Sequence, residues 1–258
     1  MQKLIWIALA TGAALFTAAT VAMNDTADMA LQRAKPAAAA PLDGKRPVVV
    51  EFFTSQGCSS CPPSDRLAAK LAREPGVLVI QRPVTYGDRL GWADTLASPT
   101  NTALQQAYAR SGLAGRNGVY TPQAVIAGRG GLVGSQERAL RQQIAEAGKL
   151  AAPAVRLRTK PDGVTEIMID GTGIGRAQVL LVGLDSDETV SVSRGENGGR
   201  SLSYTNIWKG ERALGTLSGG EASFMVDAAE KIIAGANRYA VIVRQGKAGP
   251  ILAGQILP

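Results

Sequence analysis

Runs of apolar residues alternate with glycine and proline from residue 47 to about residue 150. Residues 48–53 are β-branched or aromatic apart from Glu51, and Gly57 follows, which predicts a buried strand. Residues 62–65 are typical of a helix start, and Leu67 and Leu71 continue an amphipathic helix. Another apolar run at 77–80 predicts a second strand. A strand, helix, strand order with continuous apolar strands favours parallel pairing.

The rest of this first half continues the α/β pattern. We expect a loop over 83–99, a helix capped by Thr100 or Asn101 and ending at Ala109, a strand over 123–127, a short partner strand at 132–133, and a helix from Ser135 to about Ala147. The sequence thus predicts an α/β domain over residues 47–150.

The pattern changes after Pro153 to short segments that alternate with period two. Turn residues separate these segments, and none of them has helical periodicity. We expect strands at 155–158, 164–169, 178–184, 190–193, 222–226, 239–244 and 251–257. Several short strands without helices predict an all-β, sandwich-like domain over residues 151–258.

The N-terminus has the order of a secretory signal. Lys3 precedes an uncharged apolar stretch over 4–23 that ends in small residues. Since about 20 apolar residues also suffice to span a bilayer, residues 1–23 are interpreted as a signal peptide or an uncleaved anchor. Residues 24–46 are rich in Ala and Pro and predict a flexible linker. Either reading places the protein in the periplasm or outside the cell, with membrane contact only through that segment.

Composition excludes several classes of function. The 258 residues include 45% hydrophobic and 19% charged residues, which are globular values. A net charge of +7 without a Lys/Arg block, and only 5% aromatic residues, argue against nucleic-acid binding. The chain has no His, which excludes Ser-His-Asp and Cys-His catalysis and histidine metal sites. Two Cys cannot form a four-cysteine zinc site.

Those two cysteines, Cys58 and Cys61, carry the candidate chemistry. They form a CxxC motif between a predicted strand and a helix start. A thiol at a helix N-terminus faces unpaired N–H groups that stabilise its thiolate, and the thiolate attacks in disulfide exchange. We therefore expect Cys58 to be the nucleophile and Cys61 to resolve the mixed disulfide, with protein thiols and disulfides as partners and no cofactor or metal.

Two other interpretations stay open. A structural disulfide is common in exported proteins, although so short a loop removes little entropy from the unfolded chain. In that case the protein would be a non-enzymatic binding or interaction protein. A Cu(I) chaperone would need a third ligand, which the sequence does not suggest.

Two resemblances extend this interpretation. The CxxC after a strand, and Thr121–Pro122 opening a later strand, resemble the thioredoxin-like arrangement, in which a cis-proline lies opposite the cysteines. More specifically, residues 51–65, 90–94, 97–99, 119–123 and 194–202 resemble domain-of-unknown-function family 1223. This resemblance implies an exported bacterial protein with a thioredoxin-like domain, but no established reaction. Residues 83–88 depart from the family pattern, since they lack its His, its first Asp and its Trp.

The thioredoxin-like resemblance implies roles for Pro122, Thr121 and Glu51, and the sequence itself suggests further candidates. Pro122 and the backbone of Thr121 would hold a partner chain by strand-like hydrogen bonds. Glu51 is either a buried acid that takes the proton of Cys61 or a salt-bridged residue. Tyr86, Trp92 and Tyr120 are candidates for a peptide-binding rim, with core packing as the alternative, which we favour for Trp92. We expect Asp65 to be a carboxylate favoured by the helix N-terminus.

Overall fold

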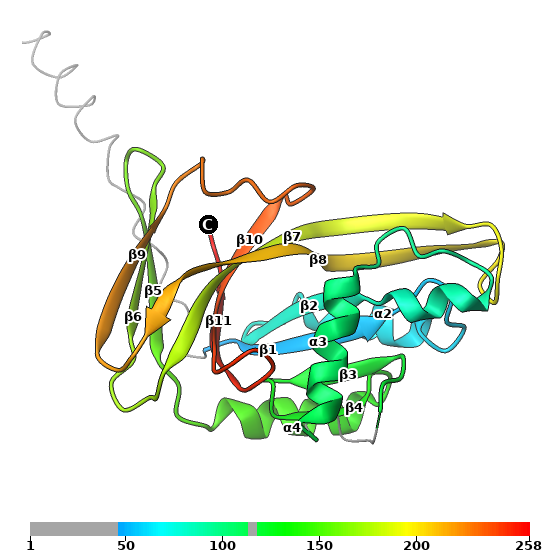
Figure 1. Ribbon diagram of the computed structural model, residues 1–258, viewed down its shortest axis with the longest axis horizontal. Helices are drawn as coiled ribbons and strands as arrows, with labels where there is room; N and C mark the ends of the chain where they lie inside the picture. Colours follow the sequence, from blue (N-terminus) through cyan, green and yellow to red (C-terminus); the bar gives the residue numbers. More distant parts are fainter. Residues whose placement is uncertain (1–45, 113–117) are drawn as a thin grey trace, which may run out of the picture. The chain divides into compact units, whose positions relative to one another are not determined.

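The computed structural model describes residues 46–112 and 118–258 (Figure 1). Residues 42–258 cluster as one compact unit. The predicted signal or anchor over 1–23 and nearly all of the predicted linker lie outside the described residues. Within 46–112 and 118–258, no helix is long and apolar enough to cross a membrane.

The first half has the predicted alternation of strands and helices. Its elements are β1 (Val48–Thr54), α2 (Pro62–Leu71), β2 (Val77–Pro83), the 3-10 helix η1 (Thr85–Leu90), α3 (Pro99–Arg110), β3 (Gln123–Ile126), β4 (Gly130–Val133) and α4 (Glu137–Gly148). The expected parallel pairing of β1 with β2 is confirmed. Two details differ. The expected loop contains η1, and α3 is capped by Ser98, whose hydroxyl accepts from the Thr100 amide at 3.2 Å.

The second half consists of strands. They are β5 (Ala154–Thr159), β6 (Thr165–Asp170), β7 (Ala177–Val192), β8 (Arg200–Leu217), β9 (Glu221–Val226), β10 (Arg238–Arg244) and β11 (Ile251–Ile256). Two predicted strands are parts of the single long strand β7. The 18-residue strand β8 was not expected from the sequence. Some of its buried positions are polar, and its buried and exposed positions do not alternate regularly.

A large mixed sheet joins the two halves, with strand order β11-β10-β7-β8-β2-β1-β3-β4. The sequence led us to expect a separate all-β domain from residue 151, but the sheet continues across that boundary. The sheet continues because β8 pairs with the edge of β2 that β1 does not occupy. Hydrogen bonds from buried polar residues join these two strands. The Thr205 backbone amide donates to Gln81 Oε1 at 2.6 Å, and the Asn206 side chain donates to the Val79 carbonyl at 3.1 Å. Such buried polar pairing has no signature in hydrophobic periodicity.

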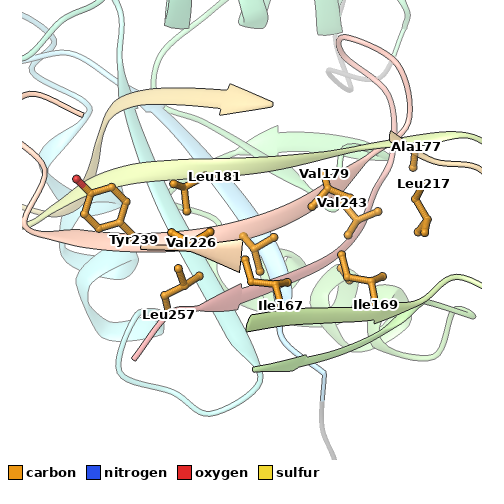
Figure 2. Close-up of a cluster of buried hydrophobic side chains, with 12 residues drawn as sticks. Ile167, Ile169, Ala177, Val179, Leu181, Leu217, Val226, Tyr239, Val243 and Leu257 are labelled. Atoms are coloured by element: carbon orange, nitrogen blue, oxygen red, sulfur yellow. The ribbon is translucent and has the colours of Figure 1, made fainter. Parts of the chain in front are cut away.

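Helices and a smaller sheet cover the large sheet. Helices α2 and α4 pack on one face through a cluster that includes Phe52, Leu71 and Leu140, while α3 packs on the other through Tyr108 and Leu104. The three-stranded sheet β5-β6-β9 covers strands of the second half. Figure 2 shows the apolar layer between these two sheets, which includes Ile167, Ile169, Val179, Leu181, Val226 and Val243. The turn between β1 and α2 lies at one end of the large sheet and contains both cysteines.

Candidate dithiol site

Cys58 and Cys61 lie in the turn that leads from β1 into α2. Cys61 is the N-cap residue of α2, and its carbonyl accepts from the amides of Ser64 and Asp65. The Cys61 amide donates to the Cys58 carbonyl at 3.1 Å, so the motif forms the turn that starts the helix. The two cysteines approach within 2.7 Å and are not joined by a disulfide. Cys58 is 6% exposed and Cys61 is fully buried, so only Cys58 is accessible from the surface.

The surroundings of the two thiols separate their acidities. The hydrogen bond from Cys61 lowers the pKa of Cys58 to about 5, against burial, and the hydroxyls of Ser60 and Thr121 contribute. The Ser60 hydroxyl lies 3.2 Å from Cys58 Sγ. For Cys61, burial raises the pKa well above its usual value, and the neighbouring Cys58 and Asp65 raise it further. At neutral pH the site therefore holds a thiolate on Cys58 and a thiol on Cys61.

Thr121 and Pro122 meet the cysteines as the sequence predicts. Strand β3 pairs antiparallel with β1, with Gln123 opposite Phe53, so the residues before β3 lie beside those after β1. The Thr121–Pro122 peptide bond is cis, which confirms that prediction. When Cys58 is protonated, its thiol donates to the Thr121 carbonyl at 3.7 Å. The site thus combines two segments that are 63 residues apart in the chain.

Asp65 is the buried acid beside Cys61. It lies one turn later in α2 and is 3% exposed. Burial raises the pKa of Asp65 to about 8, and the charges of Cys58 and Asp94 act in the same direction, against the Thr54 hydroxyl. Gln81 donates to Asp65 Oδ1 at 2.9 Å, which fixes the carboxyl group. We expected an ordinary carboxylate at the helix N-terminus, but burial raises the pKa of this group into the range near neutral pH.

Glu51 lies in a different part of the core, in a buried ionic network. Arg82 donates to Glu51 Oε1 at 2.6 Å and Arg244 to the same oxygen at 2.7 Å, while Tyr108 donates to Oε2 at 2.5 Å. Burial alone would raise the pKa of Glu51, but the two guanidinium groups and the tyrosine bring it down to about 2. A carboxylate this acidic cannot take a proton from Cys61, so Glu51 corresponds to the salt-bridged alternative.

The three aromatic candidates divide into two groups. Tyr86 and Tyr120 are half-buried and lie near Thr121: Thr121 acts on the pKa of Tyr86, and Tyr120 is adjacent to Thr121 in the chain. Burial raises the pKa of Tyr86 to about 12. Trp92 instead packs against an apolar cluster under β8 and donates from Nε1 to Gln56 Oε1 at 2.7 Å. Trp92 thus supports the loop between β1 and α2, residues 55–61, which is called the cysteine loop below. Tyr86 and Tyr120 remain candidates for the rim of a peptide-binding site.

A second acid supports the same loop. The Gln56 amide donates to Asp94 Oδ2 at 2.8 Å, and the Leu96 amide donates to Oδ1 at 2.9 Å. Burial raises the pKa of Asp94 to about 6 against these hydrogen bonds. Residues 92–96 therefore hold Gln56, two residues before Cys58, through hydrogen bonds to its backbone and side chain.

The tip of the hairpin between β7 and β8 contacts the cysteine loop directly. The sequence does not predict this contact. Asn197 is fully buried and donates from Nδ2 to the carbonyls of Gln56 and Cys58, each at 2.9 Å. The Ser59 amide donates to Glu196 Oε2 at 3.0 Å. The family resemblance of residues 194–202 was the one sequence signal here, and nothing in it specified a contact with the cysteines.

Strand β8 also contributes the buried Tyr204. Burial raises the pKa of this phenol, and the negative charges of Asp65 and Asp94 raise it further. A cavity of about 180 Å³ lies nearby, lined by Pro62, Asp65, Arg66 and residues 201–203. Residues of the second half of the chain therefore line the cavity next to Asp65. Within residues 46–112 and 118–258, no three Cys, Asp or Glu side chains are grouped as metal ligands.

Two solved structures are similar to this chain over most of its length. An X-ray structure of a protein from Agrobacterium tumefaciens, a structural-genomics target, is 31% identical, with a TM-score of 0.70 over 83% of this chain and 94% of that one. HBP35 of Porphyromonas gingivalis is 15% identical, with a TM-score of 0.50 over 83% of this chain and 75% of that one, and so shares the fold alone. No curated protein matches the chain. The family model described as "Protein of unknown function (DUF1223)" matches residues 49–244, and the chain belongs to this family.

Proposed function

We propose that this protein exchanges thiols and disulfides through Cys58 and Cys61, on a thioredoxin-like arrangement of β1, α2 and the cis-Pro122 strand. The observation that carries the proposal is the asymmetry of the two thiols, with the acidic Cys58 near the surface and the buried Cys61 behind it. A purely structural disulfide does not require such asymmetry, whereas an attacking and a resolving thiol do. The secretory pattern of residues 1–23 supports a periplasmic or extracellular location.

The reaction proceeds in two balanced steps. The Cys58 thiolate attacks one sulfur of a partner disulfide, a Cys58–partner disulfide forms, and the other partner sulfur leaves as a thiolate. Cys61 then loses its proton and attacks Cys58 Sγ, which forms the Cys58–Cys61 disulfide and releases the second partner thiolate. The partner gains two electrons and the protein loses two. The reverse sequence oxidises a partner dithiol.

Other residues of the site fit these steps. The Thr121 backbone lies beside Cys58 Sγ and is placed to bind an extended partner chain, with Tyr86 and Tyr120 at its rim. Asp65, with a pKa of about 8, accepts the proton of Cys61 when the protein is oxidised and returns it when the disulfide is reduced. Glu51 does not take part.

The redox equilibrium of the cysteine pair tests the proposal. We expect a potential between about −270 and −120 mV against a glutathione series read by thiol alkylation, which is the range of catalytic thioredoxin-like proteins. A potential below about −300 mV would instead indicate a structural disulfide and a binding protein.

Replacing Asp65 with Asn should remove the pH dependence of the resolving step. In the native protein we expect the rate of disulfide formation from a Cys58 mixed disulfide to rise through a pH of about 8, as Asp65 becomes a base. In Asp65→Asn the rate should fall by about 10²-fold or more, the typical contribution of a general base. Stopped-flow release of a chromogenic thiol measures this step.

Stability provides a separate check on Asp65. Its pKa is raised on folding, so the folded state binds more protons, and the native protein loses stability as the pH rises from about 4 to about 8. Asp65→Asn should lack this loss and be more stable than the native protein at pH 8 under reducing conditions. A variant with an unchanged rate and an unchanged pH profile would rule out the role of Asp65.

A further inference from the structure

We propose that the hairpin tip, residues 193–199 between β7 and β8, is a positioning element of the dithiol site, in which Asn197 fixes the loop of Cys58 and Glu196 limits the stability of its thiolate. The inference rests on the proposed function and deepens it, because it makes the second half of the chain part of the redox site.

The contacts of Asn197 are specific to the cysteine loop. Its side-chain amide bridges the carbonyls on either side of Gly57, and its own Oδ1 accepts from Arg200 at 3.0 Å. A fully buried amide with both donor and acceptor satisfied is expensive to replace, because the two carbonyls would lose their donor. Asn197 therefore holds the backbone from which the Cys58 side chain projects.

The tip itself is held in place against the loop that follows η1. Gly195 has a φ of 75°, and a Cβ atom there would lie 2.8 Å from the Leu90 carbonyl oxygen and 3.2 Å from Trp92 Cβ. Gly91, with a φ of 92°, faces Gly195 in turn. Below the tip, Val192 and Leu202 pack in the apolar cluster that includes Trp92. Such close backbone contact fixes the position of Glu196 and Asn197 relative to Cys58.

Glu196 adds a negative charge at the dipeptide between the cysteines. Its carboxylate accepts the Ser59 amide, the residue next to Cys58, and that hydrogen bond lowers the pKa of Glu196, so the group is ionised at neutral pH. A like charge near a thiolate disfavours the thiolate. Other charged or titratable groups lie around this site: Cys61 at the N-cap of α2, Asp65 and Arg66 on α2, Asp94 behind the loop, Tyr86 on η1, Tyr204 on β8 and Arg200 on the hairpin.

The test compares Glu196→Gln with Asp187→Asn. Glutamine keeps an acceptor for the Ser59 amide and removes only the charge, and Asp187 is an exposed carboxylate of β7 in the same hairpin. In Glu196→Gln the pKa of Cys58, measured from the pH dependence of alkylation, should fall by about 0.5, the size expected for losing one exposed like charge that contacts the residue next to Cys58. The equilibrium constant for reduction by glutathione should rise about threefold, and both shifts should shrink in 1 M salt. Asp187→Asn should behave like the native protein.

Replacing Asn197 should act in the opposite direction. In Asn197→Ala the loop loses the geometry that brings Cys58 Sγ to the side-chain donors Cys61, Ser60 and Thr121, so the pKa of Cys58 should rise. Opposite shifts from adjacent residues cannot arise from a common loss of stability. If Asn197→Ala does not fold, Glu196→Gln decides the question, because Glu196 is exposed.

The possible outcomes separate this inference from the proposed function. A Cys58 pKa that is the same in Glu196→Gln, Asp187→Asn and the native protein would overturn the inference while leaving disulfide exchange intact. If the native protein exchanges no disulfide, the proposed function fails, but the alkylation profiles still report whether the hairpin tip controls Cys58.

Discussion

Replacement of Cys58 by serine is expected to abolish thiol-disulfide exchange, with a loss of at least about 10³-fold in the rate of reaction with a small disulfide. The reason is that the thiolate is the reactive species, and the site places it on Cys58 and keeps Cys61 protonated and buried. Single-turnover reduction of a fluorescent glutathione disulfide at pH 7 measures the rate.

Cys61→Ser is the matched control, since it keeps the nucleophile and removes the second step. This variant should react with the disulfide at a rate near that of the native protein and accumulate a one-to-one mixed disulfide, seen as a mass increase on intact-protein mass spectrometry. Substantial exchange by Cys58→Ser, or failure of Cys61→Ser to accumulate the adduct, would show that the roles of the two cysteines are wrongly assigned.

Replacement of Glu51 by glutamine is expected to destabilise the protein by about 3–5 kcal/mol, as for other buried ion pairs that lose one partner. Arg82 and Arg244 are both fully buried, and without Glu51 the more exposed Glu211 is the one carboxylate left to pair with them among residues 46–112 and 118–258. Urea unfolding of the reduced protein, followed by tryptophan fluorescence, measures the change.

The control is Glu74→Gln, which removes one partner of the half-exposed surface pair with Arg141. This variant should lose less than about 1 kcal/mol. The pH dependence gives a second readout: the pKa of Glu51 is lowered on folding, so its stabilisation is complete above about pH 4.5 and is lost as the pH falls towards 2. Glu51→Gln should lack that component. Equal costs for the two variants would show that the buried network contributes no more than a surface pair.

Cys58→Ser and Glu51→Gln test two parts of the molecule, the dithiol site and the buried ionic network. The sequence predicts the first of these parts much better than the second. The positions of Cys58, Cys61, Thr121 and Pro122 followed from local patterns: a CxxC between a strand and a helix, and a Thr-Pro at the start of a later strand. These patterns specify short-range structure, and the pairing of β1 with β3 then brings the two segments together. The role of Glu51 could not be read in the same way, because its partner Arg244 lies 193 residues further along the chain.

Hydrophobic periodicity gave the helices and most strands but did not indicate β8. That strand is stabilised at its junction with β2 by buried Gln81, Thr205 and Asn206, whose hydrogen bonds take the place of an apolar face. A strand that buries satisfied polar groups looks like a loop in the sequence. This explains why the sequence did not indicate that a large mixed sheet spans both halves of the chain.

The sequence by itself determined the position of the cysteine pair at a helix start, the cis-proline opposite it and the family, since all of these depend on residues close together in the chain or on a recognisable motif. Only the tertiary structure decided which acid accompanies Cys61, and which loop fixes Cys58. Asp65 acquires a pKa near 8 through burial under β8, and Asn197 reaches the cysteine loop from 139 residues away. Burial and long-range hydrogen bonds are properties of the packed molecule, so no local pattern can specify them.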